Sequence, residues 1–87
     1  MEVVAVQISL QNNEDYEMSV AIEPWATEFI LSPGATASLI VSSTSEGYPY
    51  IALGRDLTSV YLWTGCTCRV EIDGVPMNFP GLLVPHP

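Results

Sequence analysis

The chain has 87 residues, which is room for one domain, and 48% of them are hydrophobic, a proportion typical of folded domains. Ten acidic residues face only two arginines, and there is no lysine, so the net charge is −8. A surface of this charge repels phosphate backbones and anionic lipid headgroups, which argues against nucleic acids and membranes as partners.

The N-terminal stretch shows no targeting pattern. Glu2 follows Met1 where a signal peptide needs positive charge. Gln7 and Ser9 also interrupt the apolar run well short of a membrane span of about 20 residues. These features predict a cytoplasmic protein.

Apolar and polar residues alternate through the first part of the chain, as they do on half-buried strands. Two strands are expected, and their inward residues are Val4, Val6, Ile8 and Leu10, then Tyr16, Met18, Val20 and Ile22. The polar run at 12–15 between them predicts a turn. Pro24 ends the second strand, because proline has no N–H to donate to a ladder.

A short strand with Phe29 and Leu31 inward leads into Ser32-Pro33-Gly34-Ala35. Proline at the second position and glycine at the third form the pattern of a type II turn, whose third residue needs a positive φ. We therefore expect a hairpin here. The inward residues of its second strand are Ala37, Leu39 and Val41.

A polar loop at 42–47 precedes a short strand at 50–53 and a longer one at 57–63. The longer strand is apolar on both faces, with Val60 and Leu62 on one and Tyr61 and Trp63 on the other. This pattern is typical of a strand that is central or covered.

Cys66, Cys68, Val70 and Ile72 alternate with polar residues, so they predict the inward face of a further strand. Two cysteines at i and i+2 of a strand lie about 6.5 Å apart with parallel Cβ directions, which favours reduced thiols over a disulfide. Asp73-Gly74 then supplies the positive φ values of a type I′ hairpin turn and places Ile72 opposite Val75.

Prolines at positions 76 and 80 make the last strand an edge. About seven or eight short strands joined by tight turns predict an all-β fold. We expect a small antiparallel β-sandwich with Greek-key connections, and a small β-barrel is the alternative. The single domain covers 1–87, with 81–87 as an apolar C-terminal tail.

The segment from Ile22 to Gly34 contains Glu23-Pro24-Trp25, an extended run and Pro33-Gly34. It resembles small bacterial proteins of unassigned function, and the similarity extends loosely to the strand at 60–65 and the Asp73-Gly74 turn. The resemblance implies a compact sandwich of the cupredoxin or immunoglobulin-like kind. It brings no catalytic or binding residue with it.

The side chains that could act as catalytic groups or metal ligands do not form a recognisable catalytic or metal-binding motif. A blue-copper site needs two histidines, whereas His86 is the one histidine of the chain. Zinc, calcium and phosphate sites lack their ligands or loops, and a histidine next to the C-terminus makes a poor catalytic base. We predict no enzyme activity and no cofactor.

Apolar residues on the surface are the remaining signal. Trp25 lies at a strand break, Tyr61 and Trp63 are expected to point outward, and the tail contains Leu82-Leu83-Val84 without charge. These six residues are the candidate interface of a homo-oligomer. The tail is expected either to dock on its own sandwich or to reach a second protomer.

Two functions stay open from the sequence. The first is a non-enzymatic module that acts through its surface, by self-association or by binding an unidentified protein or small molecule. The second is a small metal-binding or thiol protein that uses Cys66, Cys68 and His86 across a subunit boundary.

Overall fold

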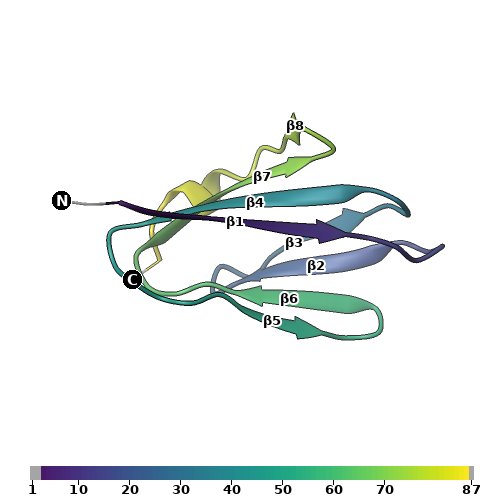
Figure 1. The fold of residues 1–87 in the computed structure, drawn as a ribbon, viewed down its shortest axis with the longest axis horizontal. Helices are drawn as coiled ribbons and strands as arrows, with labels where there is room; N and C mark the ends of the chain where they lie inside the picture. The colour runs from purple at the N-terminus through teal and green to yellow at the C-terminus, as the bar shows by residue number, and fades with distance from the viewer. Residues whose placement is uncertain (1–2, 87) are drawn as a thin grey trace.

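Two four-stranded sheets pack face to face in the computed structural model, which describes residues 3–86 (Figure 1). The elements are β1 (Val4–Gln11), β2 (Met18–Glu23), β3 (Thr27–Leu31), β4 (Thr36–Ser43), β5 (Tyr50–Leu53), β6 (Leu57–Tyr61), β7 (Cys66–Ile72), β8 (Val75–Pro76) and the 3₁₀ helix η1 (Pro80–Leu83). The predictions for Met1, Glu2, Pro87 and the Val4 side chain lie outside what the structure describes.

The strand orders are β1-β4-β7-β8 in one sheet and β3-β2-β6-β5 in the other, and neither sheet closes into a barrel. The predicted all-β sandwich is therefore confirmed, and the barrel alternative is wrong. The pairing departs from the expectation at one place, because β2 and β6 run parallel while the other pairs are antiparallel. Parallel pairing arises here because the chain crosses to the other sheet as β4 before it returns as β5 and β6.

The type II turn is present where the sequence predicts it. The Ala35 N–H donates to the Ser32 carbonyl at 3.0 Å, and Gly34 has a φ of 81°. The expectation of a hairpin is wrong, however, because β3 and β4 belong to different sheets. A turn specifies the local reversal of the chain but not which strand the next segment pairs with. Here β4 pairs with β1 and β7.

The Asp73-Gly74 hairpin is confirmed. Asp73 and Gly74 have φ values of 49° and 81°, and Ile72 is the register partner of Val75. The last strand, β8, is two residues long and lies at the edge of its sheet, as the nearby prolines predict.

The core lies between the sheets and consists largely of the alternate residues expected from the sequence. Tyr16 is an exception: it was expected inward but is 41% exposed, because β2 begins only at Met18. Its fully buried members include Val20, Ile22, Leu31, Ala37, Leu39, Val41, Val60, Cys66 and Cys68. Both cysteines are free thiols, which confirms their prediction as core residues. Within residues 3–86, no helix has the length and hydrophobicity needed to cross a membrane.

Asn12 differs from its expectation as part of a polar surface turn, because its side chain is fully buried. Its Nδ2 donates to the Tyr16 carbonyl at 2.8 Å and to the Leu31 carbonyl at 2.9 Å. Its Oδ1 accepts the Glu14 N–H at 2.9 Å. The amide is buried because it supplies hydrogen bonds to backbone groups where β1 passes into β2.

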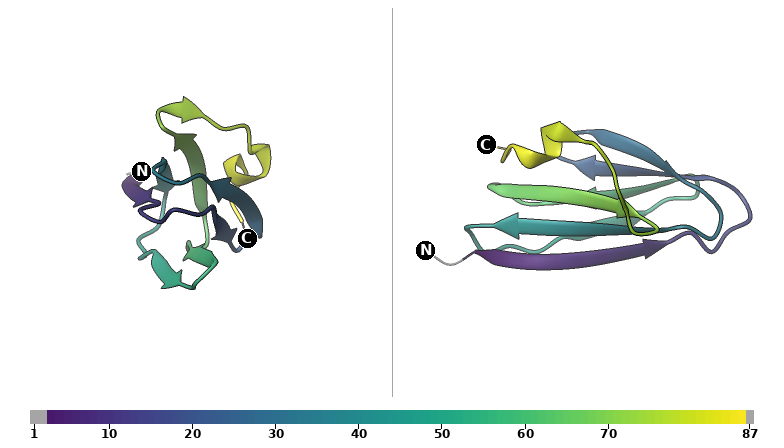
Figure 2. Two further views of the ribbon diagram at one scale, coloured as in Figure 1. Left: turned by 90° about the vertical axis from the view of Figure 1, so that its right-hand side faces the viewer. Right: turned by 90° about the horizontal axis from the view of Figure 1, so that it is seen from above.

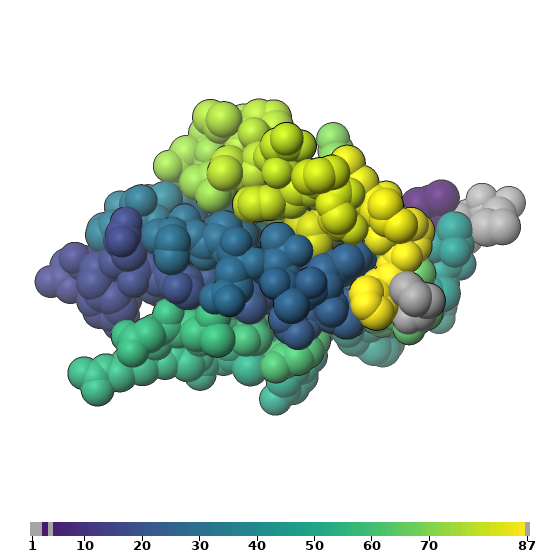
Figure 3. All heavy atoms as spheres, turned by 180° about the vertical axis from the view of Figure 1, so that it is seen from behind, coloured from purple at the N-terminus to yellow at the C-terminus, as the bar shows by residue number. Residues whose placement is uncertain are grey.

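The C-terminal tail closes one side of the sandwich. Figure 2 places η1 on the side away from β1, and Figure 3 shows the tail lying against the chain around β3. Leu82 is fully buried, and the Phe79 ring stacks on Phe29 of β3 with centroids 5.9 Å apart. The tail therefore docks on its own sandwich through Leu82.

Candidate interaction surface

The two tryptophans of the predicted interface are partly buried and serve the fold. Trp25 packs against the core, and its Nε1 donates to the Val84 carbonyl at 3.1 Å. The Trp63 Nε1 donates to the Ser45 carbonyl at 3.0 Å. The Trp63 ring also lies so close to Gly47 that a Cβ there would sit 2.3 Å from it. Trp63 was expected to point outward, but these contacts fix it on the loop between β4 and β5.

The tail residues of the predicted interface divide between core and surface. Leu82 is buried within its own protomer, whereas Leu83 and Val84 are 55% and 64% exposed. The helix η1 is a single 3₁₀ turn that packs on β7 with one face. Leu82 lies on that face, so the residues that follow it point outward. Leu83 and Val84 remain available to a partner, and Leu82 does not.

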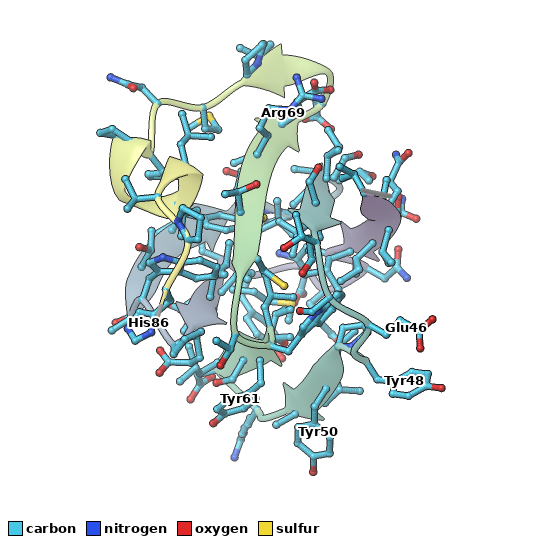
Figure 4. All side chains as sticks on the ribbon, turned by 90° about the vertical axis from the view of Figure 1, so that its left-hand side faces the viewer. Glu46, Tyr48, Tyr50, Tyr61, Arg69 and His86 are labelled. Atoms are coloured by element: carbon cyan, nitrogen blue, oxygen red, sulfur yellow. The ribbon has the colours of Figure 1, made fainter. Side chains whose placement is uncertain are left out.

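Tyr61 is exposed, and it belongs to a cluster of tyrosines on β5, on β6 and in the loop before β5. Its ring packs on that of Tyr50, the register partner on β5, with centroids 5.8 Å apart. Tyr48 is 92% exposed, and Tyr48 and Tyr50 project away from the sandwich (Figure 4). We call the surface formed by Tyr48, Tyr50 and Tyr61 the tyrosine edge.

The backbone beside the tyrosine edge is unprotected. β5 is the last strand of its sheet, so one side of it has no neighbouring strand within the sandwich. The residues from Gly47 to Leu53 carry no charge, while Glu46 precedes them and Arg55 follows. Sheet edges that avoid association usually carry a lysine, an inward charge or a proline within the strand. None of these three occurs within β5 itself, which is four residues long and follows Pro49.

The sequence pattern indicates an outward Tyr61 but gives no sign that Tyr48, Tyr50 and Leu53 are exposed. The strand at 50–53 was predicted with its correct bounds. Its place at the end of a sheet was not visible, since four consecutive apolar residues look the same in a central and an edge strand. Exposure of Leu53, at 81%, follows from that edge position.

The two thiols are buried in the core, and the histidine lies beside Trp25. Burial raises the pKa of the Cys66 thiol. The pKa of Cys68 is raised to about 11, mainly by burial and to a smaller extent by the charge of Cys66. The His86 carbonyl accepts the Gly65 N–H at 3.2 Å, and its ring packs edge-on to Trp25. Within residues 3–86, no three His, Cys, Asp or Glu side chains gather in a group that could hold a metal ion.

No family model, no curated protein and no solved structure matches this chain. The resemblance of the segment from Ile22 to Gly34 to small bacterial sandwich proteins therefore stays a prediction.

Proposed function

We propose that the protein acts without catalysis, as a module that assembles with further copies of itself through the tyrosine edge. The observation that carries this proposal is the set of exposed large hydrophobic side chains on β5, on β6 and in the loop before β5. They are Tyr48, Tyr50, Ile51, Leu53, Leu57 and Tyr61. Tyrosine is enriched at protein interfaces because it buries a large area with few rotatable bonds and keeps a polar tip.

The free edge of β5 supplies the backbone part of such a contact. Its unpaired N–H and C=O groups can form an antiparallel ladder with β5 of a second copy, which joins the two β3-β2-β6-β5 sheets. Pairing of a strand with itself across a two-fold axis makes a closed, isologous dimer. β1 is a longer edge strand, but its outward residues are Ala5, Gln7, Ser9 and Gln11, so it offers less apolar area to bury.

The charges at the two ends of β5 favour the antiparallel arrangement. Glu46 lies before the strand and Arg55 after it. An antiparallel pair places the Arg55 end of one copy beside the Glu46 end of the other, twice by symmetry. This local attraction acts against the repulsion between two chains of charge −8.

The first experiment is the mass of the protein in solution by analytical ultracentrifugation. We expect at least a dimer at tens of micromolar concentration, and a shift toward monomer in Tyr50→Ser and Tyr61→Ser. Ile30→Ser is the matched control, because Ile30 is 52% exposed on β3 at the opposite edge of the same sheet. A monomeric wild-type protein would contradict self-association.

Charge reversal tests the geometry separately. Arg55→Glu and Glu46→Arg should each weaken the dimer, and the double variant should restore it, because the attraction then returns with its signs exchanged. Failure of the double variant to recover would show that the copies meet in another arrangement.

A further inference from the structure

An open slot lies between the two sheets, on the side where β1 and β5 are the edge strands. Its volume is about 170 Å³. The apolar lining of the slot comes from Leu10, Met18, Val20, Leu31 and Leu53. On the opposite side of the sandwich, the fully buried Leu82 of the tail fills the gap between the sheets (Figure 2). The slot has no such cover among residues 3–86, and Leu53 at its rim is 81% exposed.

The backbone of β5 shows which of its residues can pair with a further strand. The Gly54 N–H donates to the Leu57 carbonyl of β6 at 2.8 Å. In an antiparallel ladder, residues whose N–H and C=O groups point to one neighbour alternate with residues whose groups point the other way. Ala52 therefore faces β6 as Gly54 does, while the N–H and C=O groups of Ile51 and Leu53 face the free side.

These directions favour one register for two antiparallel copies of β5. With Ile51 of each copy opposite Leu53 of the other, all the outward N–H and C=O groups of both strands are paired, and Ala52 lies opposite itself on the two-fold axis. A shift by two residues in one direction sets Leu53 against Pro49, which has no N–H to donate. A shift in the other direction sets Ile51 against Arg55, which lies outside the strand.

In this register the inward side chains of the second copy reach the slot. Ile51 is the register partner of the fully buried Val60, so Ile51 and Leu53 both lie on the inward face of their sheet. A second β5 continues the sheet with the same face inward. Its Ile51 then packs beside the Leu53 that lines the slot, and the apolar side chains of the two copies cover one another.

The outward side chains fit the same register. The small Ala52 lies on the axis, where the two strands come closest on this face. Tyr50 of each copy lies opposite Gly54 of the other, which has no side chain to occupy the space of the ring. The tyrosine edge can therefore pack across the axis without a clash.

We propose that the second copy completes the core of the first: the two β5 strands pair with Ile51 opposite Leu53, and these two side chains of each copy cover the open slot of the other. This inference rests on the proposed function and adds the register of its interface. The slot thus receives from a second copy the apolar cover that Leu82 supplies on the opposite side.

A disulfide on the two-fold axis tests the register. Opposite residues of a non-hydrogen-bonded antiparallel pair have Cα atoms about 4.5 Å apart, which a disulfide can span. We expect Ala52→Cys to form a covalent dimer in a glutathione redox buffer, measured by mass spectrometry without reductant. Ser59→Cys is the matched control and should not cross-link, because Ser59 is the partner of Ala52 on β6, one strand away from the axis.

The outcome separates the register from the proposed function. A wild-type protein that sediments as a dimer, while Ala52→Cys does not cross-link or cross-links no better than Ser59→Cys, would overturn the register and leave assembly through the tyrosine edge standing. A monomeric wild-type protein would overturn both.

A substitution and an NMR measurement test the cover of the slot. Leu53→Ser should raise the dissociation constant of the dimer at least about tenfold, because each copy buries this side chain against the other. Leu83→Ser is the matched control, since Leu83 is an exposed leucine on the tail and should leave the constant unchanged. In a mixture of labelled and unlabelled copies, we expect intermolecular NOEs from the Ile51 methyl groups to Leu53 and Leu10. Absence of these NOEs in a dimeric protein, or equal effects of the two substitutions, would overturn the cover.

Discussion

At the scale of single residues, Asn12 connects more of the structure than any neighbour in its turn. Its side chain bonds three backbone groups, and its own N–H donates to the Ala35 carbonyl at 3.0 Å. We expect Asn12→Ala to lower the free energy of unfolding by about 1–3 kcal/mol, because buried backbone groups lose their partners. Urea denaturation measures this. Asn13→Ala is the control and should stay within about 0.5 kcal/mol, since Asn13 is exposed.

The buried thiols give a dependence of stability on pH. The pKa of Cys68 rises from an ordinary 9.0 to about 11 in the folded protein. Between these values the unfolded chain loses the thiol proton while the folded protein keeps it, so stability is full below pH 9 and declines toward pH 11. The decline should be smaller in Cys68→Ala. A thiol reagent at pH 8 should label neither cysteine until denaturant is added. Rapid labelling in the folded state would contradict their burial.

At the scale of elements, the turn at Pro33-Gly34 connects the two sheets. The free-energy cost of placing a residue with a Cβ at its positive φ can be measured separately from steric clashes. A Cβ at Gly34 meets no atom within 4 Å, so Gly34→Ala is opposed only by the φ of 81°. We expect a loss of about 1 kcal/mol. Gly81→Ala is a matched control, because Gly81 also has open space but no positive φ. Equal thermal midpoints for the two variants would exclude strain at the turn.

The tail offers a second comparison between neighbours. Leu82 is fully buried, and Leu83 is 55% exposed. We expect Leu82→Ala to lower the free energy of unfolding by about 2–5 kcal/mol through loss of contacts and a cavity. Leu83→Ala should change it by less than about 0.5 kcal/mol. If both substitutions are equally mild in chemical denaturation, the tail does not belong to the core.

At the scale of the whole molecule, net charge sets how copies of the chain approach one another. Two molecules of charge −8 repel, and salt screens this repulsion beyond about 8 Å at physiological ionic strength. Association through the uncharged tyrosine edge should therefore strengthen as salt is added, which sedimentation at several salt concentrations measures. A weaker dimer at high salt would mean that the Glu46 and Arg55 attraction dominates. Salt would then weaken the contact, and the apolar surface would contribute less than we propose.

The sequence by itself determined the strands, the turns and most of the core. Alternation of period two marks the inward residues of β4 and β7, because side chains on a strand point to opposite faces. Pro33-Gly34 and Asp73-Gly74 place two turns, because few residues accept a positive φ. The burial of Cys66 and Cys68 followed from their register with Val70.

Only the tertiary structure decided which strands are neighbours and which surfaces remain open. Strand order depends on contacts between residues far apart in the chain, and alternation looks the same in every pairing. For this reason Trp63 and Leu82, expected at an interface, are found to support the fold. The exposure of Tyr48 and Leu53 likewise follows from their place at or beside β5, at the edge of its sheet.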